Sequence, residues 1–197
     1  MSYIVKKKIA VAAKALISQK GLEKVSVTNI MATAQLRRQT FYDYFQDKYD
    51  LLVWLYEDEV SQVVDDNLNY EHWSKVLYHL CGYFADNRAF YCQVFENHAQ
   101  NAPGLAIEAH THHLVDLIVT DMVQTRKIDI KTAYRHFLVN FLTNGLVSEI
   151  KWWLANEVEI DAKVEFKAVQ QIIEDTFNGL LLRTAPITRY EHQEISI

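Results

Sequence analysis

Glycine and proline are scarce in this chain, with only five glycines and two prolines among 197 residues. An all-β fold needs a turn about every ten residues, and such turns draw heavily on these two residue types. The long stretches without either residue are instead typical of helices. We therefore predict an all-α protein built from long helices.

Hydrophobic spacing and capping residues divide the chain into about nine helices. The first ends just before Gly21, which can adopt the left-handed conformation that stops a helix. Ser26 is suited to cap a short second helix, and a third short helix begins near Arg37 or Arg38. Asp47 caps a fourth helix that runs to about residue 65. Longer helices are expected over residues 71–85, 88–99, 103–126, 131–155 and 162–182.

The net charge of −5 conceals a division along the chain. Residues 1–50 hold nine Lys/Arg and four Asp/Glu, a net of +5, so the remaining residues carry −10. A basic head suits phosphate binding, and an acidic body favours solubility. Chance clustering on a solvated face is the alternative. We predict a domain boundary near residue 50, with domains over residues 1–50 and 51–197.

The cysteines, the N-terminal pattern and the longest uncharged run all favour a cytoplasmic protein. Cys81 and Cys92 lie in a helical region, which is unlike the disulfide scaffold of an exported protein. Lys14 interrupts the apolar stretch near the N-terminus, so we expect no signal peptide. Residues 136–148, the longest run without Asp, Glu, Lys or Arg, are too few to span a bilayer.

Residues 26–48 have the layout of a helix-turn-helix. Two short predicted helices follow a longer one, and the last of them carries Arg, Gln, Thr and Tyr on its outer face. Phe41 and Phe45, four residues apart, are expected to pack in the core of this small domain. Only the outward side chains are therefore candidates for contacts with DNA.

The run from Ala34 to Lys48, AQLRRQTFYDYFQDK, closely resembles the DNA-binding domain of the tetracycline-repressor (TetR) family. The resemblance implies a bacterial transcription regulator that binds a near-palindromic operator as a homodimer. The stretch from Arg37 to Tyr44 is also similar to that of activators of dihydroxyacetone-kinase operons, a branch that responds through a protein partner resembling the kinase subunit. The similarity covers about residues 6–55 and includes Ala12-Ala13, Leu16, Gly21, Val25-Ser26-Val27, Ile30 and Leu51.

Base reading is expected from Arg37, Arg38 and Gln39, at the start of the recognition helix. Arginine suits the acceptors of guanine, and glutamine suits the mixed edge of adenine. Two residues depart from the commonest family pattern, because Gln35 replaces the usual glycine of the turn and Arg37 the usual Ser or Thr cap. The turn could therefore have an altered geometry, and the helix start could depend on water or a DNA phosphate for its cap.

Contacts with DNA phosphates are expected from hydroxyl groups of the recognition helix, from the lysine that starts the fourth helix and from the N-terminal lysines. The hydroxyls match family positions that hydrogen-bond phosphates, and a helix start with a cation suits the same group. The N-terminal lysines could instead form a disordered arm. The candidates are Thr40, Tyr42, Tyr44, Lys48, Lys6 and Lys7.

The last two predicted helices carry apolar stripes wider than one subunit readily covers. Such a pair suits a four-helix interface with a second copy, which the resemblance also implies. Two-fold symmetry would place the recognition helices about 34–36 Å apart, one turn of DNA. The stripes could alternatively be entirely intramolecular. The predicted interface residues are Phe141, Ile150, Trp153, Ile173, Phe177 and Leu180.

The predicted helices between the two ends are rich in aromatic residues. In the TetR family such a body surrounds an effector pocket, so the resemblance implies an apolar site with few polar anchors for a small molecule, or regulation by a partner protein. Aromatic core packing explains the same residues without any ligand. The pocket candidates are Tyr83, Phe84, Tyr91, Phe95, His113, Phe137, Phe141 and Asn144.

Metal binding, cofactor binding and catalysis find little support in the sequence. His110 and His113 share a helix face, but a zinc site needs three or four convergent ligands. The chain has no G-x-G-x-x-G, P-loop, H-E-x-x-H, E-x-x-H or G-x-S-x-G motif. We therefore expect that the protein binds no metal and no cofactor and is not an enzyme. The alternative to a regulator is a helical adaptor for protein partners, and the choice between repressor and activator stays open.

Overall fold

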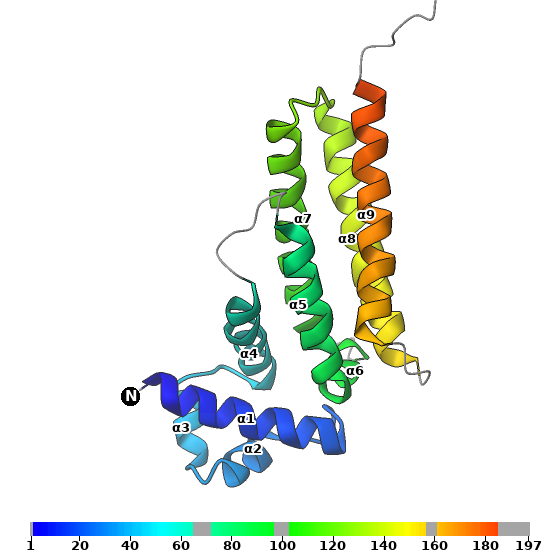
Figure 1. Cartoon of the computed structure of the whole chain (residues 1–197). Coiled ribbons are helices and arrows are strands. Elements are labelled where there is room, and N and C mark those ends of the chain that lie inside the picture. The colour runs from blue at the N-terminus through cyan, green and yellow to red at the C-terminus, as the bar shows by residue number, and fades with distance from the viewer. Residues whose placement is uncertain (1, 65–71, 97–102, 157–160, 185–197) are drawn as a thin grey trace, which may run out of the picture.

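The computed structural model describes residues 2–64, 72–96, 103–156 and 161–184 (Figure 1). Within these ranges the chain forms nine helices and no strand, which confirms the all-α fold. No helix in these ranges is long and apolar enough to cross a membrane. The helices are α1 (Ser2–Lys20), α2 (Val27–Thr33), α3 (Arg38–Tyr42), α4 (Lys48–Val63), α5 (Trp73–Asp86), α6 (Arg88–Phe95), α7 (Pro103–Thr125), α8 (Thr132–Ala155) and α9 (Ala162–Thr184).

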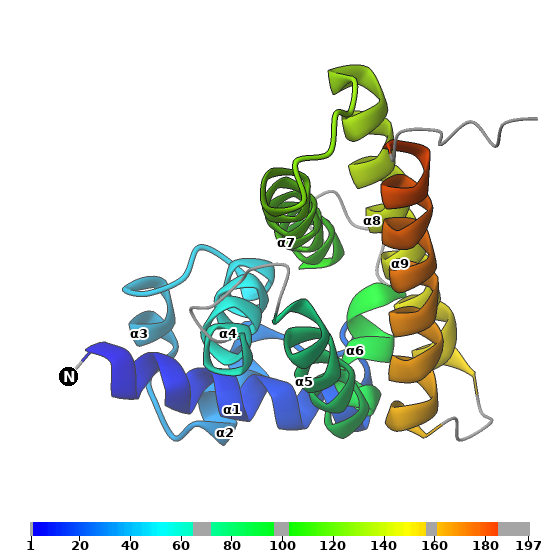
Figure 2. The same ribbon diagram turned by 45° about the horizontal axis from the view of Figure 1, so that its top comes forward.

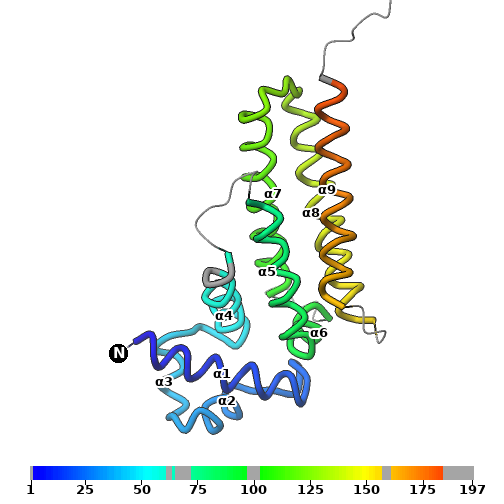
Figure 3. Tube along the Cα trace, viewed as in Figure 1, coloured from blue at the N-terminus to red at the C-terminus, as the bar shows by residue number. Residues whose placement is uncertain are grey.

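The helices form an L-shaped molecule (Figure 1). α1 lies across the foot of the L with α2 and α3 beside it, and the long helices α5, α7, α8 and α9 form the upright arm. The Cα trace in Figure 3 shows how α4 rises from the foot toward that arm. In the turned view of Figure 2, α4, α5 and α7 separate α1–α3 from α8 and α9. α4 packs against α1, α5 and α7, so it joins the two parts.

The hydrophobic core is continuous across residue 50, where the sequence predicts a domain boundary. One cluster of buried side chains combines Ile17 of α1, Phe41 of α3 and Leu55 of α4 with Tyr91 of α6 and Trp153 of α8. A second cluster fills the space between α5, α7, α8 and α9. The predicted boundary therefore lies within α4 and within shared packing, so the N-terminal helices are fixed to the body without a linker.

The ends of the first helices follow from single residues. Ser26 Oγ accepts a hydrogen bond from the Asn29 amide, and Asp47 accepts from the amides at the start of α4. Gly21 ends α1 at φ +84°, in the left-handed region that favours glycine. A Cβ atom at Gly21 would lie 2.8 Å from Oε1 at the end of the flexible Gln93 side chain, so it is the positive φ that requires glycine there. The caps predicted at Ser26 and Asp47 and the stop at Gly21 are confirmed.

Candidate nucleic-acid interface and core cavity

The turn before α3 keeps a left-handed residue although it lacks glycine. Gln35 has φ +54°, so it takes the conformation that glycine usually provides in this turn. The Leu36 amide donates to the Met31 carbonyl across the turn. Arg37 is the N-cap of α3 and makes no side-chain capping hydrogen bond. The departures at Gln35 and Arg37 thus change the residues and not the left-handed form of the turn.

Replacement of Gln35 by glycine is expected to stabilise the protein. A side chain in the left-handed region costs about 1 kcal/mol, and the greater freedom of glycine in the unfolded chain offsets part of the gain. We expect about 0.5 kcal/mol more free energy of unfolding, measured from urea denaturation. The matched control is Ala32→Gly on the exposed side of α2, which should lose about 1 kcal/mol. A loss of stability in Gln35→Gly would contradict the left-handed assignment.

The side chains predicted to read bases project from the start of α3. Arg37, Arg38 and Gln39 are exposed, while Phe41 behind them is completely buried. The guanidinium of Arg38 lies over the ring of Tyr42, 5.9 Å from its centroid, and its Nη2 is 3.4 Å from the hydroxyl oxygen. α3 is therefore anchored by one face and presents the other to solvent.

All three lysines predicted to bind phosphate have partners within the chain. Lys48 Nζ donates to the carbonyl oxygens of Leu22, at 2.9 Å, and Val25, at 3.3 Å. Lys7 Nζ forms an ion pair of 2.6 Å with Asp58. Lys6 Nζ lies 5.5 and 5.4 Å from the ring centroids of Phe45 and Trp54. These three lysines brace the N-terminal helices.

The other predicted phosphate contacts are more open. Tyr42 is exposed, whereas Thr40 and Tyr44 are half-buried. Lys20 and Lys24, which the sequence prediction did not select, are also exposed, but they lie at the end of α1 beside Gln93 and Glu96 at the end of α6. Sequence alone could not separate the bracing lysines from the exposed ones, because their partners lie more than 20 residues away.

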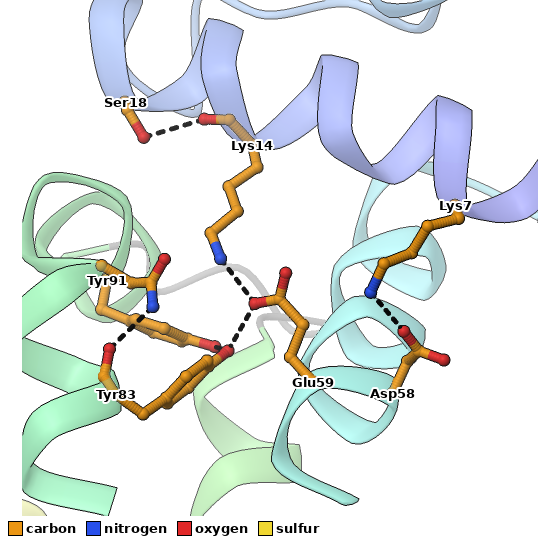
Figure 4. Close-up of polar contacts among 8 residues, drawn as sticks. Lys7, Lys14, Ser18, Asp58, Glu59, Tyr83 and Tyr91 are labelled. Carbon is orange, nitrogen blue, oxygen red and sulfur yellow. Dashed lines mark hydrogen bonds and ion pairs between the residues drawn. The ribbon is translucent and has the colours of Figure 1, made fainter. Parts of the chain in front are cut away.

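A polar network joins α1 to the body (Figure 4). Lys14 Nζ of α1 lies 2.5 Å from Glu59 Oε2 of α4, and both side chains are about four-fifths buried. The Tyr83 hydroxyl of α5 donates to the same carboxylate oxygen at 2.8 Å, and the Tyr91 hydroxyl of α6 is hydrogen-bonded to that of Tyr83. Burial raises the pKa of both tyrosines, so they stay neutral. The network links four helices at the junction between head and body.

The core contains an apolar cavity between α4, α5, α7, α8 and α9. Of the predicted pocket residues, Phe84 lines it. Tyr83 and Tyr91 belong to the polar network, and Phe95 packs beside them. His113, Phe137, Phe141 and Asn144 are exposed on α7 and α8. The lining includes Trp73, Leu114, Val169, Ile173 and Glu165, which the sequence prediction missed.

An exposed aromatic ladder runs along α8. Tyr134, Phe137 and Phe141 stack in sequence, with centroid distances of 6.1 and 5.8 Å. Phe137 is 59% exposed and Phe141 64%, and Ile172 on α9 is 59% exposed. The groove between them is lined by residues of both helices. Apolar side chains of this size are seldom left in water over a continuous surface.

Most residues predicted for the dimer interface are buried in the subunit itself. Trp153, Ile173, Phe177 and Leu180 retain at most 8% exposure because they pack against α5, α6 and α7. Phe141 keeps most of its surface, and Ile150 is half-buried. The apolar stripes of α8 and α9 therefore have two faces, and four of the six predicted interface residues lie on the face that packs inside the subunit.

Two of the three histidines of α7 contact neighbouring helices. His110 Nδ1 lies 2.8 Å from the Tyr56 hydroxyl, and burial lowers the pKa of His110. His112 Nε2 lies 3.1 Å from Asn140 Oδ1. Among the described residues, no group of three His, Cys, Asp or Glu side chains could hold a metal ion.

Two family models match the chain. The model described as "Bacterial regulatory proteins, tetR family" matches residues 9–54, which contain α2 and α3. The model described as "Transcriptional regulator C-terminal region" matches residues 71–175, more than half of the chain. Together they cover the region of the exposed recognition residues and most of the body.

Individual relatives are similar to this chain in sequence or in fold. The HTH-type dhaKLM operon transcriptional activator DhaS of Lactococcus lactis subsp. lactis is 40% identical over 94 residues, spanning 48% of this chain and half of that relative. A solved structure of the dihydroxyacetone kinase operon activator DhaS has a TM-score of 0.68 at 26% identity and covers 92% of this chain and 97% of its own. A TetR regulator from Streptococcus agalactiae, at 19% identity, covers 87% and 94% with a TM-score of 0.63 and shows the fold alone.

Proposed function

Because this chain belongs to the TetR family of bacterial DNA-binding transcriptional regulators, which are not enzymes, we propose that it binds a near-palindromic operator as a homodimer in the cytoplasm. The observation that carries the proposal is the exposure of Arg37, Arg38 and Gln39 on a helix anchored by the buried Phe41. Residues 1–50 supply the DNA contacts, and residues 51–197 supply the dimer interface and respond to an effector.

The recognition helix enters the major groove in this proposal. Arg37 and Arg38 donate to guanine, and Gln39 pairs with the edge of adenine. Tyr42, Thr40 and Tyr44 contact the phosphates. Lys6, Lys7 and Lys48 act indirectly, because they hold α1 and the loop before α2 in place.

The exposed surface of α8 and α9 forms the dimer interface in this proposal. The aromatic ladder of Tyr134, Phe137 and Phe141 lies beside the exposed Ile172, and a second copy would cover both. A two-fold arrangement presents the same surface from each subunit. It also sets two recognition helices against successive major grooves, about 34–36 Å apart.

The two DhaS relatives favour an activator over a repressor. We propose that this chain activates an operon that encodes dihydroxyacetone kinase, and that an effector or partner protein controls it. Deletion of the gene should lower transcription of that operon, measured by quantitative RT-PCR. A rise in transcription would instead identify a repressor.

Arg38→Ala is expected to weaken binding to the operator by about 1–3 kcal/mol, because a bidentate contact with guanine is lost. Binding to random duplex should weaken much less, since only one charge is removed. The matched control is Arg38→Lys, which keeps the charge and loses the paired donors. Fluorescence anisotropy with operator and random duplexes at one salt concentration measures the difference. Equal losses on both duplexes for Arg38→Ala would remove Arg38 from the base-reading set.

A further inference from the structure

The polar network of Lys14, Glu59, Tyr83 and Tyr91 lies inside an otherwise apolar core. Tyr91 is completely buried, and the side chains of Lys14 and Glu59 are about four-fifths buried. The desolvation of a buried ion pair often costs as much as the pairing returns, so apolar side chains of similar volume could fill the same space at no loss of stability. The network therefore points to a role in fixing geometry.

The ammonium group of Lys14 extends from α1 to the body. Besides its ion pair with Glu59, it lies 5.6 Å from the ring centroid of Tyr83 on α5 and 5.7 Å from that of Phe90 on α6. Figure 4 shows the Lys14 side chain pointing from α1 toward Glu59 and Tyr83. A cation over an aromatic ring is attracted to its face. Lys14 therefore contacts the joining helix α4 and two helices of the body.

A second ion pair fixes α1 to α4. Lys7 pairs with Asp58 at 2.6 Å, and Asp58 directly precedes Glu59 in α4. Lys7 and Lys14 lie two turns apart on one face of α1, so both lysines can reach the same segment of α4. These two ion pairs hold α1 and α4 together, and we refer to α1–α4 as the head.

Tyr83 links this head to α5 and α6. Its hydroxyl donates to Glu59 at 2.8 Å and is itself hydrogen-bonded to the Tyr91 hydroxyl. One turn earlier in α4, the Tyr56 hydroxyl is bonded to His110 of α7 at 2.8 Å, so Glu59 supplies the restraint that comes from α5 and α6. Hydrogen bonds are directional, whereas the apolar contacts around them are not. The bonds of Glu59 can therefore hold the head at one angle to the body.

We propose that Tyr83 and Glu59 are positioning residues, which set the angle between head and body and thereby the half-site spacing that the dimer accepts. The inference rests on the proposed function, because a spacing is defined only for a dimer on an operator with two half-sites. Neither side chain touches DNA in this proposal. Base reading stays with the exposed residues of α3.

A small change in this angle is enough to alter the spacing. Because α1 has 19 residues and is roughly 28 Å long, a rotation of the head by about 5° moves one end of α1 relative to the other by about 2 Å. A two-fold axis doubles this displacement between the two heads, to more than the rise of about 3.4 Å per base pair. Selection of one spacing therefore requires a restraint on the head.

The test compares three duplexes by fluorescence anisotropy: the operator footprinted upstream of the protein's own operon, the same operator with one base pair inserted at its centre, and a single half-site. The spacing ratio is the affinity for the first divided by that for the second. It should be about thirtyfold for the wild type, because the insertion weakens binding by the linked subunit. Tyr83→Phe removes only the hydroxyl that bonds to Glu59, so its ratio should fall to about fivefold, a change of the size of one net hydrogen bond. Half-site affinity should not change.

Two further variants separate positioning from a loss of stability. A protein that is only less stable loses affinity for all three duplexes by the same factor, so its spacing ratio stays at the wild-type value. The matched control is Tyr78→Phe, because Tyr78 is 44% exposed on the same helix, and it should keep the wild-type ratio. Glu59→Gln retains the shape of the side chain but removes the charge that strengthens its bonds to Lys14 and Tyr83, so it should also lower the ratio.

The inference and the proposed function fail in different ways. A wild-type spacing ratio in both Tyr83→Phe and Glu59→Gln would overturn the inference, and so would a wild-type protein that binds the two spacings equally well. In either case specific binding to the operator would leave the proposed function intact. A wild-type protein that prefers none of the duplexes to random DNA would reject the proposed function itself.

Discussion

A double variant with Phe137→Asp and Phe141→Asp is expected to be monomeric and to lose about a hundredfold or more in operator affinity, because the second half-site is no longer bound by a linked subunit. Both phenylalanines are largely exposed in the subunit, so two aspartates there leave its own core untouched. In the proposed dimer the same positions are buried. Four unpaired carboxylates would have to be desolvated to form the interface.

Sedimentation velocity measures the mass of this variant, and anisotropy measures its operator affinity. Circular dichroism should show unchanged helix content, which separates loss of the dimer from loss of the fold. The matched control is Leu105→Asp, because Leu105 is 58% exposed on α7, away from the ladder. A variant that sediments as a dimer would contradict the interface placed on α8 and α9.

Removal of Lys14 should cost about 3 kcal/mol of unfolding free energy, the lower end of the range for breaking a buried ion pair. Lys14→Met keeps much of the length of the side chain and leaves the Glu59 carboxylate with Tyr83 as its neutral partner. The lower end applies because each side chain of the pair keeps about a fifth of its surface exposed. The loss should appear as a lower urea midpoint.

The double variant Lys14→Met/Glu59→Gln is the control for this pair. It removes both charges, so it should be more stable than Lys14→Met alone. A coupling energy near zero across the four proteins of this cycle would show that the 2.5 Å contact contributes nothing to stability. If the network also fixes α1 relative to the body, Lys14→Met should weaken operator binding even at temperatures where it is fully folded.

Much of the fold could be predicted from local patterns in the sequence. Ser26, Asp47 and Gly21 set helix ends through hydrogen bonds or backbone conformation within a few residues. The nearby sequence is therefore enough to predict these helix ends. Phe41 in α3 and Phe45 in the turn after it are linked by the hydrogen bond from the Phe45 amide to the Phe41 carbonyl, and both are buried. Such short-range effects do not depend on how the rest of the chain packs.

The partners of lysines could not be predicted in the same way. Lys14 and Glu59 are 45 residues apart, and Lys48 bonds to carbonyls more than 20 residues earlier. The neighbouring sequence does not distinguish a lysine that hydrogen-bonds to a loop from a lysine that is free to contact a phosphate. Only the tertiary arrangement separates Lys48 from the exposed Lys24.

Hydrophobic periodicity also fails to predict which face is buried in a helix that is apolar on two faces. α8 carries Phe141 outward and Trp153 inward, and both belong to apolar stripes at helical spacing. Glu165 did leave a readable signal, because it occupies the register of Val169, Ile173 and Phe177 at intervals of four. A single acid in an apolar stripe marks a buried charge, and that rule would have selected it.

The most direct test of the central claim is the binding of the purified protein to DNA from upstream of its own operon, compared with random duplex over a salt series. We expect a footprint on a near-palindromic site, at least about a thousandfold tighter than random duplex, with affinity that falls steeply as salt rises. A folded, dimeric protein that binds both duplexes equally would contradict the account and favour a helical adaptor for protein partners.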